Sequence, residues 1–342
     1  MIFKTTFISL LALTTSAYDE LPKVCDDTYK CSYSGLGLVA SKEDGAETYL
    51  PIIQNAAQIF EKHFGKKTGL TALTLGGSVP DTFKDALKKN GYTTIMPWLT
   101  PDQKSKLVAS NIKKQIKAQQ PSLPDATVDT IVAEQVEKLQ KQGAVQSGDL
   151  EKGVLAHELA HMWFHHAYYP DSEPDGEPQY GSDAPDWLDE LSAVLAENEA
   201  VTKGRLKALK KLAASGNFDA FWPLEEYFQM EHPLFRQVTK IREQASKSKE
   251  SSSIMIKNLD DFDLGENVRN PADFYAQSRG FADYLMDKSG NPAIFHEIAS
   301  HISDGHSMES WLAKNGKQHN IPTSITELEA DWHTWMKSYY AS

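Results

Sequence analysis

Apolar and polar positions divide the chain into a first half that mixes strands with helices and a second half that is almost entirely helical. Two short runs rich in Leu, Thr and Ile, each beside a glycine, predict strands at 70–75 and 92–96. Apolar residues three and four positions apart predict helices over most of the remainder. In the first half these helices cover residues 46–64, 81–89, 101–119, 125–142 and 149–168. In the second half they cover residues 187–201, 204–213, 223–232, 234–245, 271–289, 292–303 and 323–340.

This succession of elements predicts an α+β fold with two subdomains. The N-terminal subdomain, 18–169, holds a small sheet and ends in the helix predicted at 149–168. The C-terminal subdomain, 170–342, begins with a loop rich in Asp, Glu, Pro and Gly and is otherwise mainly helical. A cleft is expected where the two subdomains meet.

Composition argues against two kinds of partner. Of the 342 residues, 40% are hydrophobic and 24% are charged, which is ordinary for a soluble globular protein. The formal net charge of -12 argues against nucleic acid, whose binding needs a basic surface. After the N-terminus no apolar run approaches the roughly 20 residues that span a bilayer, so no membrane span is predicted.

The N-terminus has the pattern of an export signal. Lys4 precedes an apolar run at 7–13, and the small residues Thr15 and Ala17 follow it at the spacing of a cleavage site. These features predict a signal peptide over 1–17 and a secreted or periplasmic mature protein. The alternative is a buried N-terminal helix.

The only two cysteines, Cys25 and Cys31, lie just after this segment. An exported protein reaches an oxidising compartment, where two cysteines this close form a small disulfide loop. Free thiols are the alternative. Two cysteines without a nearby histidine are too few ligands for a metal site, so the predicted disulfide is structural.

The helix predicted at 149–168 carries the strongest chemical pattern. His157 and His161 stand four residues apart on one helical face, a spacing that binds a single metal ion through two imidazoles. Glu158 lies about 100° around the helix from His157, so it can reach a water molecule bound to the metal without being a ligand itself. The remaining face is apolar, which predicts burial, and buried ionisable groups need partners. A chance match on an amphipathic helix is the alternative to a Zn²⁺ site.

A catalytic zinc ion needs a third protein ligand. His165 lies one further helical turn beyond His161, roughly 6 Å along the axis, so it cannot converge with the other two histidines. His165 and His166 are therefore expected outside the ligand set. The helix predicted at 187–201, after the acidic loop, offers a carboxylate instead, and Glu190 is one candidate. The competing carboxylates of this segment are Asp189, Glu197 and Glu199.

Two segments resemble a known family. Residues 187–193, Trp-Leu-Asp-Glu-Leu-Ser-Ala, resemble the Trp-Leu-Asn-Glu-Gly-Phe-Ala segment of aminopeptidase N-type gluzincins, in which the Glu is the third zinc ligand. Glu190 occupies that position, after a longer interval from His161 than the family has. Residues 274–285 resemble the helix of peptidase-MA-like proteins whose first tyrosine donates a hydrogen bond to the oxyanion, and Tyr275 matches that tyrosine. The rival donors from this half of the chain are His232, His296 and His301.

The resemblance implies a thermolysin-like zincin fold and a zinc-dependent peptidase acting on peptide or protein substrates. In such an enzyme Glu158 is the general base, and a strand at the cleft edge, 70–75 or 92–96, pairs with an extended peptide. The chain lacks the Gly-x-Met-Glu-Asn segment that precedes the zinc helix in the aminopeptidases, which favours an endopeptidase. A zinc-binding adhesin or scaffold without turnover, and a zinc hydrolase of non-peptide amides, are the alternative functions.

The acidic loop at 170–186 suggests a second cation. Its composition is compatible with a calcium site but is equally typical of a solvated flap. The acidic residues of the loop are Asp171, Glu173, Asp175, Glu177, Asp183 and Asp186.

Overall fold

The computed structural model describes residues 24–25, 27–141, 146–172, 183–233 and 269–340. The predicted signal peptide at 1–17, the predicted helix at 234–245 and most of the acidic loop lie outside these residues. None of the helices described combines the length and the apolar character that a membrane crossing requires.

A single sheet forms the centre of the N-terminal half, with the strands in the order β1-β2-β3-β4. β1 runs antiparallel to β2, whereas β2, β3 and β4 are parallel. The strands are Lys30–Ser34, Gly37–Ser41, Leu70–Leu75 and Tyr92–Trp98. β3 and β4 confirm the two predicted strands. The β1–β2 hairpin was not predicted, because β2 is buried on both faces and so shows no alternation of polar and apolar residues.

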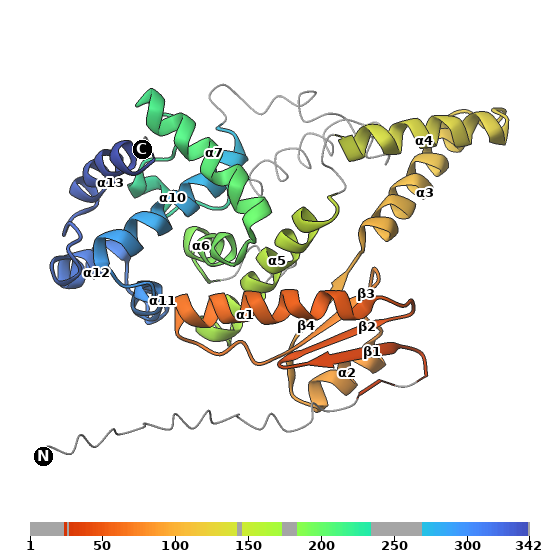
Figure 1. The fold of residues 1–342 in the computed structure, drawn as a ribbon, viewed down its shortest axis with the longest axis horizontal. Coiled ribbons are helices and arrows are strands. Elements are labelled where there is room, and N and C mark those ends of the chain that lie inside the picture. The colour runs from red at the N-terminus through yellow and green to blue at the C-terminus, as the bar shows by residue number, and fades with distance from the viewer. Residues whose placement is uncertain (1–23, 26, 142–145, 173–182, 234–268, 341–342) are drawn as a thin grey trace, which may run out of the picture.

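Helices cover both faces of this sheet (Figure 1). α1 (Leu50–Phe64) and α5 (Asp149–Tyr168) lie on one face, and α2 (Asp81–Lys89) lies on the other. The alternation of side chains along a strand divides the core accordingly. In β2, Val39 joins the large core with α1 and α5, whereas its neighbours Leu38 and Ala40 pack with α2. The predicted disulfide between Cys25 and Cys31 is confirmed beside β1.

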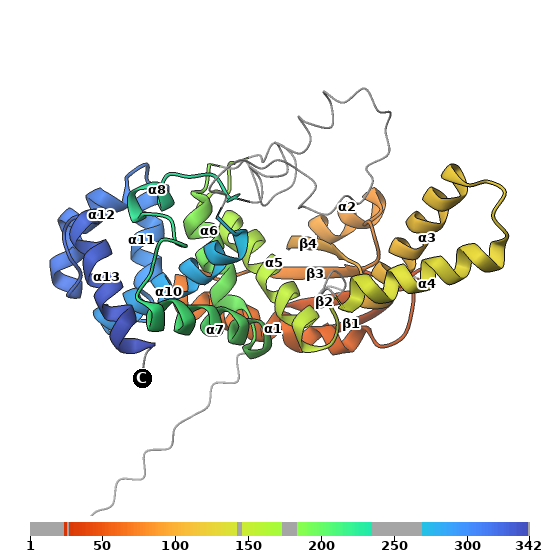
Figure 2. The ribbon, with the colours of Figure 1, turned by 90° about the horizontal axis from the view of Figure 1, so that it is seen from above.

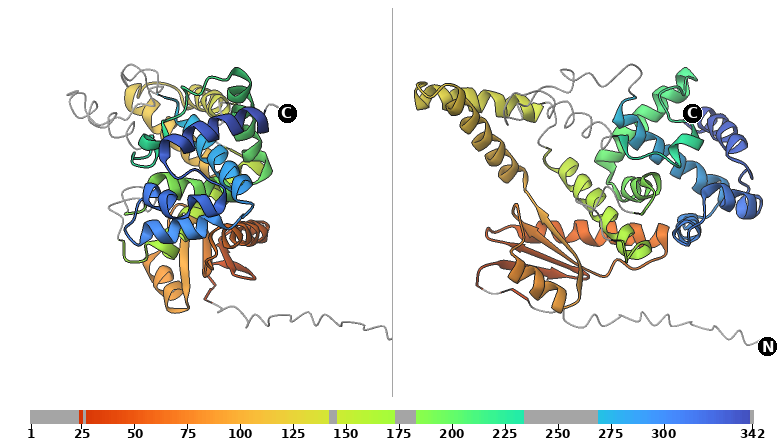
Figure 3. Two further views of the ribbon diagram at one scale, coloured as in Figure 1. Left: turned by 90° about the vertical axis from the view of Figure 1, so that its left-hand side faces the viewer. Right: turned by 180° about the vertical axis from the view of Figure 1, so that it is seen from behind.

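The described part of the C-terminal half is helical, as predicted, and the α+β fold class is confirmed. α5 packs against α6 and α7 on the side away from the sheet, and α6 packs against α10 (Figure 3). α5 therefore lies between the two halves. The helices of this half are α6 (Asp186–Ala196), α7 (Glu199–Ser215), α8 (Leu224–Tyr227), α10 (Pro271–Ser289), α11 (Ile294–Ser303), α12 (Met308–Asn315) and α13 (Ile325–Tyr339).

The helix predicted at 187–201 is wrong at its end, because the chain breaks between α6 and α7. Glu197 has an extended backbone with ψ of 144°, and Asn198 begins the next helix by accepting a hydrogen bond from the amide of Val201 at 3.3 Å. The Asn198 amide group also donates to the carbonyl oxygen of Asp149 at 2.6 Å, which fixes the break against the start of α5. The helix predicted at 223–232 is also too long, since α8 forms one turn.

α3 (Pro101–Gln119) and α4 (Asp125–Lys141) form a helical hairpin that projects from the body, between β4 and α5 in the sequence (Figure 2). Its buried apolar side chains form a cluster of their own, separate from the two cores of the sheet. The fully or nearly buried members are Ile112, Val128 and Val132. Both helices were predicted from the sequence.

Candidate metal centre

α5 is held between the sheet and α6 in one rotational setting. The indole N–H of Trp163 donates to Thr71 Oγ1 of β3 at 3.1 Å, and Thr94 Oγ1 of β4 lies 3.2 Å from His166 Nδ1. These contacts point the face with His157 and His161 toward α6. His157 is 8% exposed and His161 3% exposed, so the predicted burial of this helix is confirmed.

The structure brings the three predicted ligands together. His157 Nε2 lies 3.2 Å from His161 Nε2 and 3.3 Å from Glu190 Oε1, and one ligand atom from each residue lies within 4.8 Å of the others. Zinc–ligand bonds of 2.0–2.1 Å in a tetrahedron separate neighbouring ligand atoms by about 3.3–3.4 Å. The described part of the chain holds no other group of this kind.

Glu190 shows why a cation suits this position. Its side chain is 2% exposed, and Oε1 accepts no hydrogen bond from any described residue. A buried carboxylate oxygen that accepts no hydrogen bond is costly without a positive partner. The donor set of two imidazoles and one carboxylate therefore fits a divalent ion, and it leaves the fourth tetrahedral position open.

The outer nitrogens of the two histidines each face a carboxylate. His157 Nδ1 lies 3.0 Å from Glu197 Oε1, and His161 Nδ1 lies 2.9 Å from Asp189 Oδ1. Carboxylates in these positions orient a metal-binding imidazole and keep its proton on Nδ1, which leaves Nε2 for the ion. Asp189 and Glu197 thus hold the histidines and do not compete with Glu190. The break after α6 is what brings Glu197 back to His157, so its position was not predictable on a continuous helix.

The carboxylates also determine the charge of the histidines. Burial opposes a proton on His161, but Asp189 outweighs burial and raises the pKa of His161 to about 10. Burial likewise disfavours charge on Asp189, yet His161 lowers the pKa of Asp189 to about 2. The raised pKa of His161 favours a second proton on its imidazole, and a metal ion must displace that proton.

Glu158 and Tyr275 lie beside the three ligands. On α5, Glu158 falls between the direction of β4, marked by His166, and the direction of α6, marked by His161. Its side chain is half-buried. The ring of Tyr275, in the second turn of α10, has its centre 5.8 Å from the centre of the His157 ring. The catalytic roles of both residues remain predictions.

Of the three rival donors, only His232 lies at this site. His232 Nε2 is 3.3 Å from Glu190 Oε2, and the backbone N–H of His232 donates to Asp186 at 2.5 Å. His296 instead contacts the hydroxyl of Tyr168 at 3.0 Å, and His301 contacts Ser310 at 2.8 Å. No local spacing in the sequence indicated that His232 contacts the third ligand.

The remaining candidates lie outside the ligand set. His165 Nε2 is 3.2 Å from Asp189 Oδ2, so His165 contacts the carboxylate that also contacts His161. His165 is not part of the three-residue group, in agreement with its predicted distance along the helix axis. Glu199 is exposed on the first turn of α7. Among the described residues of the acidic loop, Asp171, Asp183 and Asp186 form no further metal-binding group, and a calcium site there stays a prediction.

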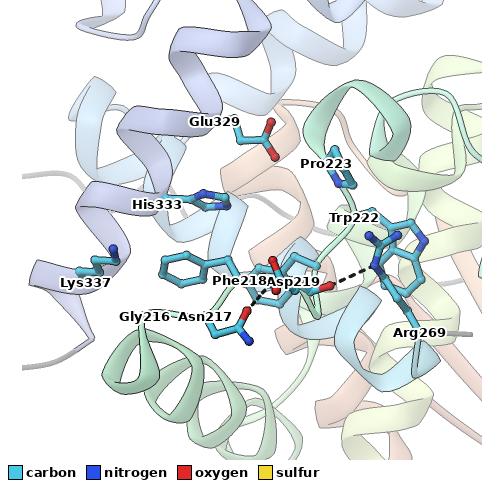
Figure 4. Close-up of a pocket in the computed structure, with 11 residues that line it drawn as sticks. Gly216, Asn217, Phe218, Asp219, Trp222, Pro223, Arg269, Glu329, His333 and Lys337 are labelled. Atoms are coloured by element: carbon cyan, nitrogen blue, oxygen red, sulfur yellow. Dashed lines mark hydrogen bonds between the residues drawn. The ribbon is translucent and has the colours of Figure 1, made fainter. Parts of the chain in front are cut away.

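A separate hollow of about 560 Å³ lies near the end of α7, beside α13 (Figure 4). None of His157, His161 and Glu190 lines this hollow. Its polar groups bind one another: Arg269 Nε donates to the Asp219 carbonyl at 3.2 Å, and the Asp219 amide donates to Asn217 at 2.8 Å. His333 stacks on Phe218 with ring centres 4.5 Å apart. These internal contacts leave no reason to assign a ligand to this hollow.

No protein-family model, curated protein or solved structure matches this chain.

Proposed function

We propose that this chain is an exported, zinc-dependent peptidase of the gluzincin type, with a thermolysin-like arrangement of its two halves. The observation that carries the proposal is the convergence of one ligand atom each from His157, His161 and Glu190 within 4.8 Å of one another. His157 Nε2 lies at the spacing of tetrahedral ligands from both of the others. Two imidazoles and a carboxylate suit Zn²⁺, and an open fourth position is typical of catalytic zinc rather than structural zinc.

The protein side chains around this site fit hydrolysis of an amide. A bound zinc ion would supply Lewis-acid polarisation of the carbonyl and a more acidic water. In this proposal Glu158 accepts the proton of the attacking water and passes it to the leaving nitrogen. The Tyr275 ring lies beside His157, and in this proposal its hydroxyl donates a hydrogen bond to the carbonyl oxygen as that oxygen gains negative charge.

β4 supports a peptide as the substrate. β3 and β4 are the two strands predicted to bind a peptide. β3 pairs on both sides, whereas β4 pairs with β3 alone among the described residues. An open strand edge binds an extended peptide through main-chain hydrogen bonds. Export is supported by the disulfide, because disulfides persist in oxidising compartments.

The test combines metal analysis with peptide turnover. We expect one zinc ion per purified chain, and we expect a peptide library read by mass spectrometry to be cleaved until a chelator is added. Glu158→Gln should retain zinc and lose turnover by at least about 10²-fold, because the base is gone while the ligands remain. His161→Ala should lose the zinc itself.

The outcomes separate the alternatives. A zinc-loaded wild-type protein that cleaves no peptide but hydrolyses a cell-wall amide would assign the site to non-peptide amides. A zinc-loaded protein with neither activity would be a binding module. Full turnover in Glu158→Gln would remove Glu158 from the mechanism.

A further inference from the structure

We propose that Arg205 is a positioning residue that couples the His157 side of the metal centre to Tyr275. This inference rests on the proposed function for the part that concerns Tyr275. Arg205 lies on α7, two turns after the break that follows α6. Three described groups that belong to the site meet at its guanidinium: the Glu197 carboxylate, the Tyr275 ring and, through Glu197, the His157 imidazole.

The edge of the guanidinium binds Glu197 with two nitrogens. Arg205 Nη2 donates to Glu197 Oε1 at 2.8 Å, and Arg205 Nε donates to Glu197 Oε2 at 3.3 Å. Two parallel N–H bonds fix a carboxylate in orientation as well as in position. Glu197 Oε1 is also the atom that faces His157 Nδ1 at 3.0 Å. The orientation of the His157 ring therefore depends on Arg205 through Glu197.

Arg205 is also the lasting counter-charge of Glu197. The Glu197 side chain is 1% exposed, and a carboxylate so deeply buried needs a positive partner. Its ion-pair partners among the described residues are His157 and Arg205. When His157 binds a metal it is neutral, so Arg205 is then the one full positive charge on Glu197.

The same guanidinium lies over the ring of Tyr275. Arg205 Cζ lies 4.4 Å from the centre of the Tyr275 ring, well inside the roughly 6 Å range of a cation–π contact. The other neighbours of this ring include His157 and His232, with ring centres 5.8 Å and 5.5 Å away. Since the carboxylate fixes the plane of the guanidinium, the guanidinium in turn fixes the tilt of the phenol. An error of about 1 Å in such a group costs roughly 10²-fold in rate.

The first experiment changes Arg205 alone. Arg205→Met keeps an unbranched apolar stem and removes both the paired N–H donors and the charge. We expect zinc affinity, measured by competition with a chromophoric chelator, to fall about 10-fold, the lower end of what loss of such an outer contact costs. We expect kcat on a cleaved peptide to fall at least as much, with KM nearly unchanged. Arg205→Lys should recover part of the zinc affinity and little of kcat, since an ammonium cannot form the paired N–H bonds.

Arg279 provides the matched control. Its side chain is 19% exposed, against 20% for Arg205, and it also donates through Nε to a carboxylate, Asp283, at 3.0 Å. It lies on α10, one turn after Tyr275, but contacts none of the ligands. Arg279→Met should therefore leave zinc affinity and kcat at wild-type values, whatever it does to the melting temperature.

Double variants decide whether Arg205 acts through the two named partners. In a Glu197→Gln background, Arg205→Met should cost no further zinc affinity; in a Tyr275→Phe background it should cost little further kcat. Additive losses in both backgrounds, or wild-type zinc affinity in Arg205→Met, would overturn the proposal. If Arg205→Met fails to fold, Arg205→Lys takes its place in both cycles. If the wild-type protein cleaves no peptide, the proposed function fails, while the zinc-affinity cycle still decides the coupling of Arg205 to Glu197.

Discussion

At the scale of single residues, Glu190 is the proposed ligand that the histidine motif does not supply. It is 2% exposed and faces both imidazoles, whereas Glu199, nine positions further on, is exposed on α7. Glu190→Ala should therefore remove tight zinc binding, and Glu199→Ala should leave it unchanged. Glu197→Ala should weaken zinc binding less than Glu190→Ala, because Glu197 acts on the ion through His157. Chelator competition measures all three, and equal effects of Glu190→Ala and Glu199→Ala would contradict the ligand assignment.

The proposed role of Tyr275 is to stabilise the oxyanion of the transition state. A zinc ion alone leaves part of the charge of an oxyanion unmatched, and one well-placed donor is worth roughly 2–4 kcal/mol in the transition state. Tyr275→Phe keeps the ring, and therefore the stacking with Arg205, while it removes the hydroxyl. We expect kcat to fall about 10²-fold with zinc content and melting temperature near wild type. A Phe variant with full kcat would transfer the role to His232, which lies next to Tyr275.

The sequence predicts the parts of this site that helix geometry determines. His157, Glu158 and His161 lie on one helix, so their spacing alone defines how they converge. The partners of these residues are harder to foresee. Arg205 and His232 reach the site only through the packing of α7 and of the chain after α8, and neither position carries a pattern in the sequence that indicates it.

At the scale of elements, the length of most helices follows from periodicity and capping, but the break between α6 and α7 does not. The segment 187–201 has continuous helical character, and the break arises because the side chain of Asn198 binds both Val201 of its own helix and Asp149 of α5. The second of these contacts is tertiary. Local sequence therefore cannot predict this contact, although the contact determines the direction of the Glu197 side chain.

Gly153 permits the close approach of α5 and α7 at this break. A Cβ atom on Gly153 would lie within 3.0 Å of the side chains of Asn198 and Val201, whereas a Cβ on Gly204 of α7 would meet nothing within 4 Å. Gly153→Ala should cost about 1–3 kcal/mol of unfolding free energy through overpacking. Gly204→Ala should gain about 0.5–1 kcal/mol, because alanine favours the helix. Chemical denaturation of the two variants compares these effects, and a stabilising Gly153→Ala would contradict the packing at the break.

At the scale of the whole molecule, three histidines outside the site make stability depend on pH. Burial lowers the pKa of His63, His166 and His333 below the ordinary value of 6.5. As pH falls below 6.5, the unfolded chain takes up these protons before the folded chain does, so the free energy of unfolding falls. We expect the melting temperature to decrease between pH 7 and pH 5. His63→Gln should make this decrease smaller, and an unchanged slope would rule out His63 as a contributor.

The projecting hairpin of α3 and α4 has a consequence for how order is distributed in the molecule. Its own core consists of few side chains, and it joins the body between β4 and α5, the strand and helix that border the site. A unit with so little buried area opens at a small fraction of the global unfolding free energy. Its amide hydrogens should therefore exchange with solvent long before those of α5. β4, the strand with the open edge, is thus followed by a hairpin that can unfold and refold while the proposed metal centre stays folded.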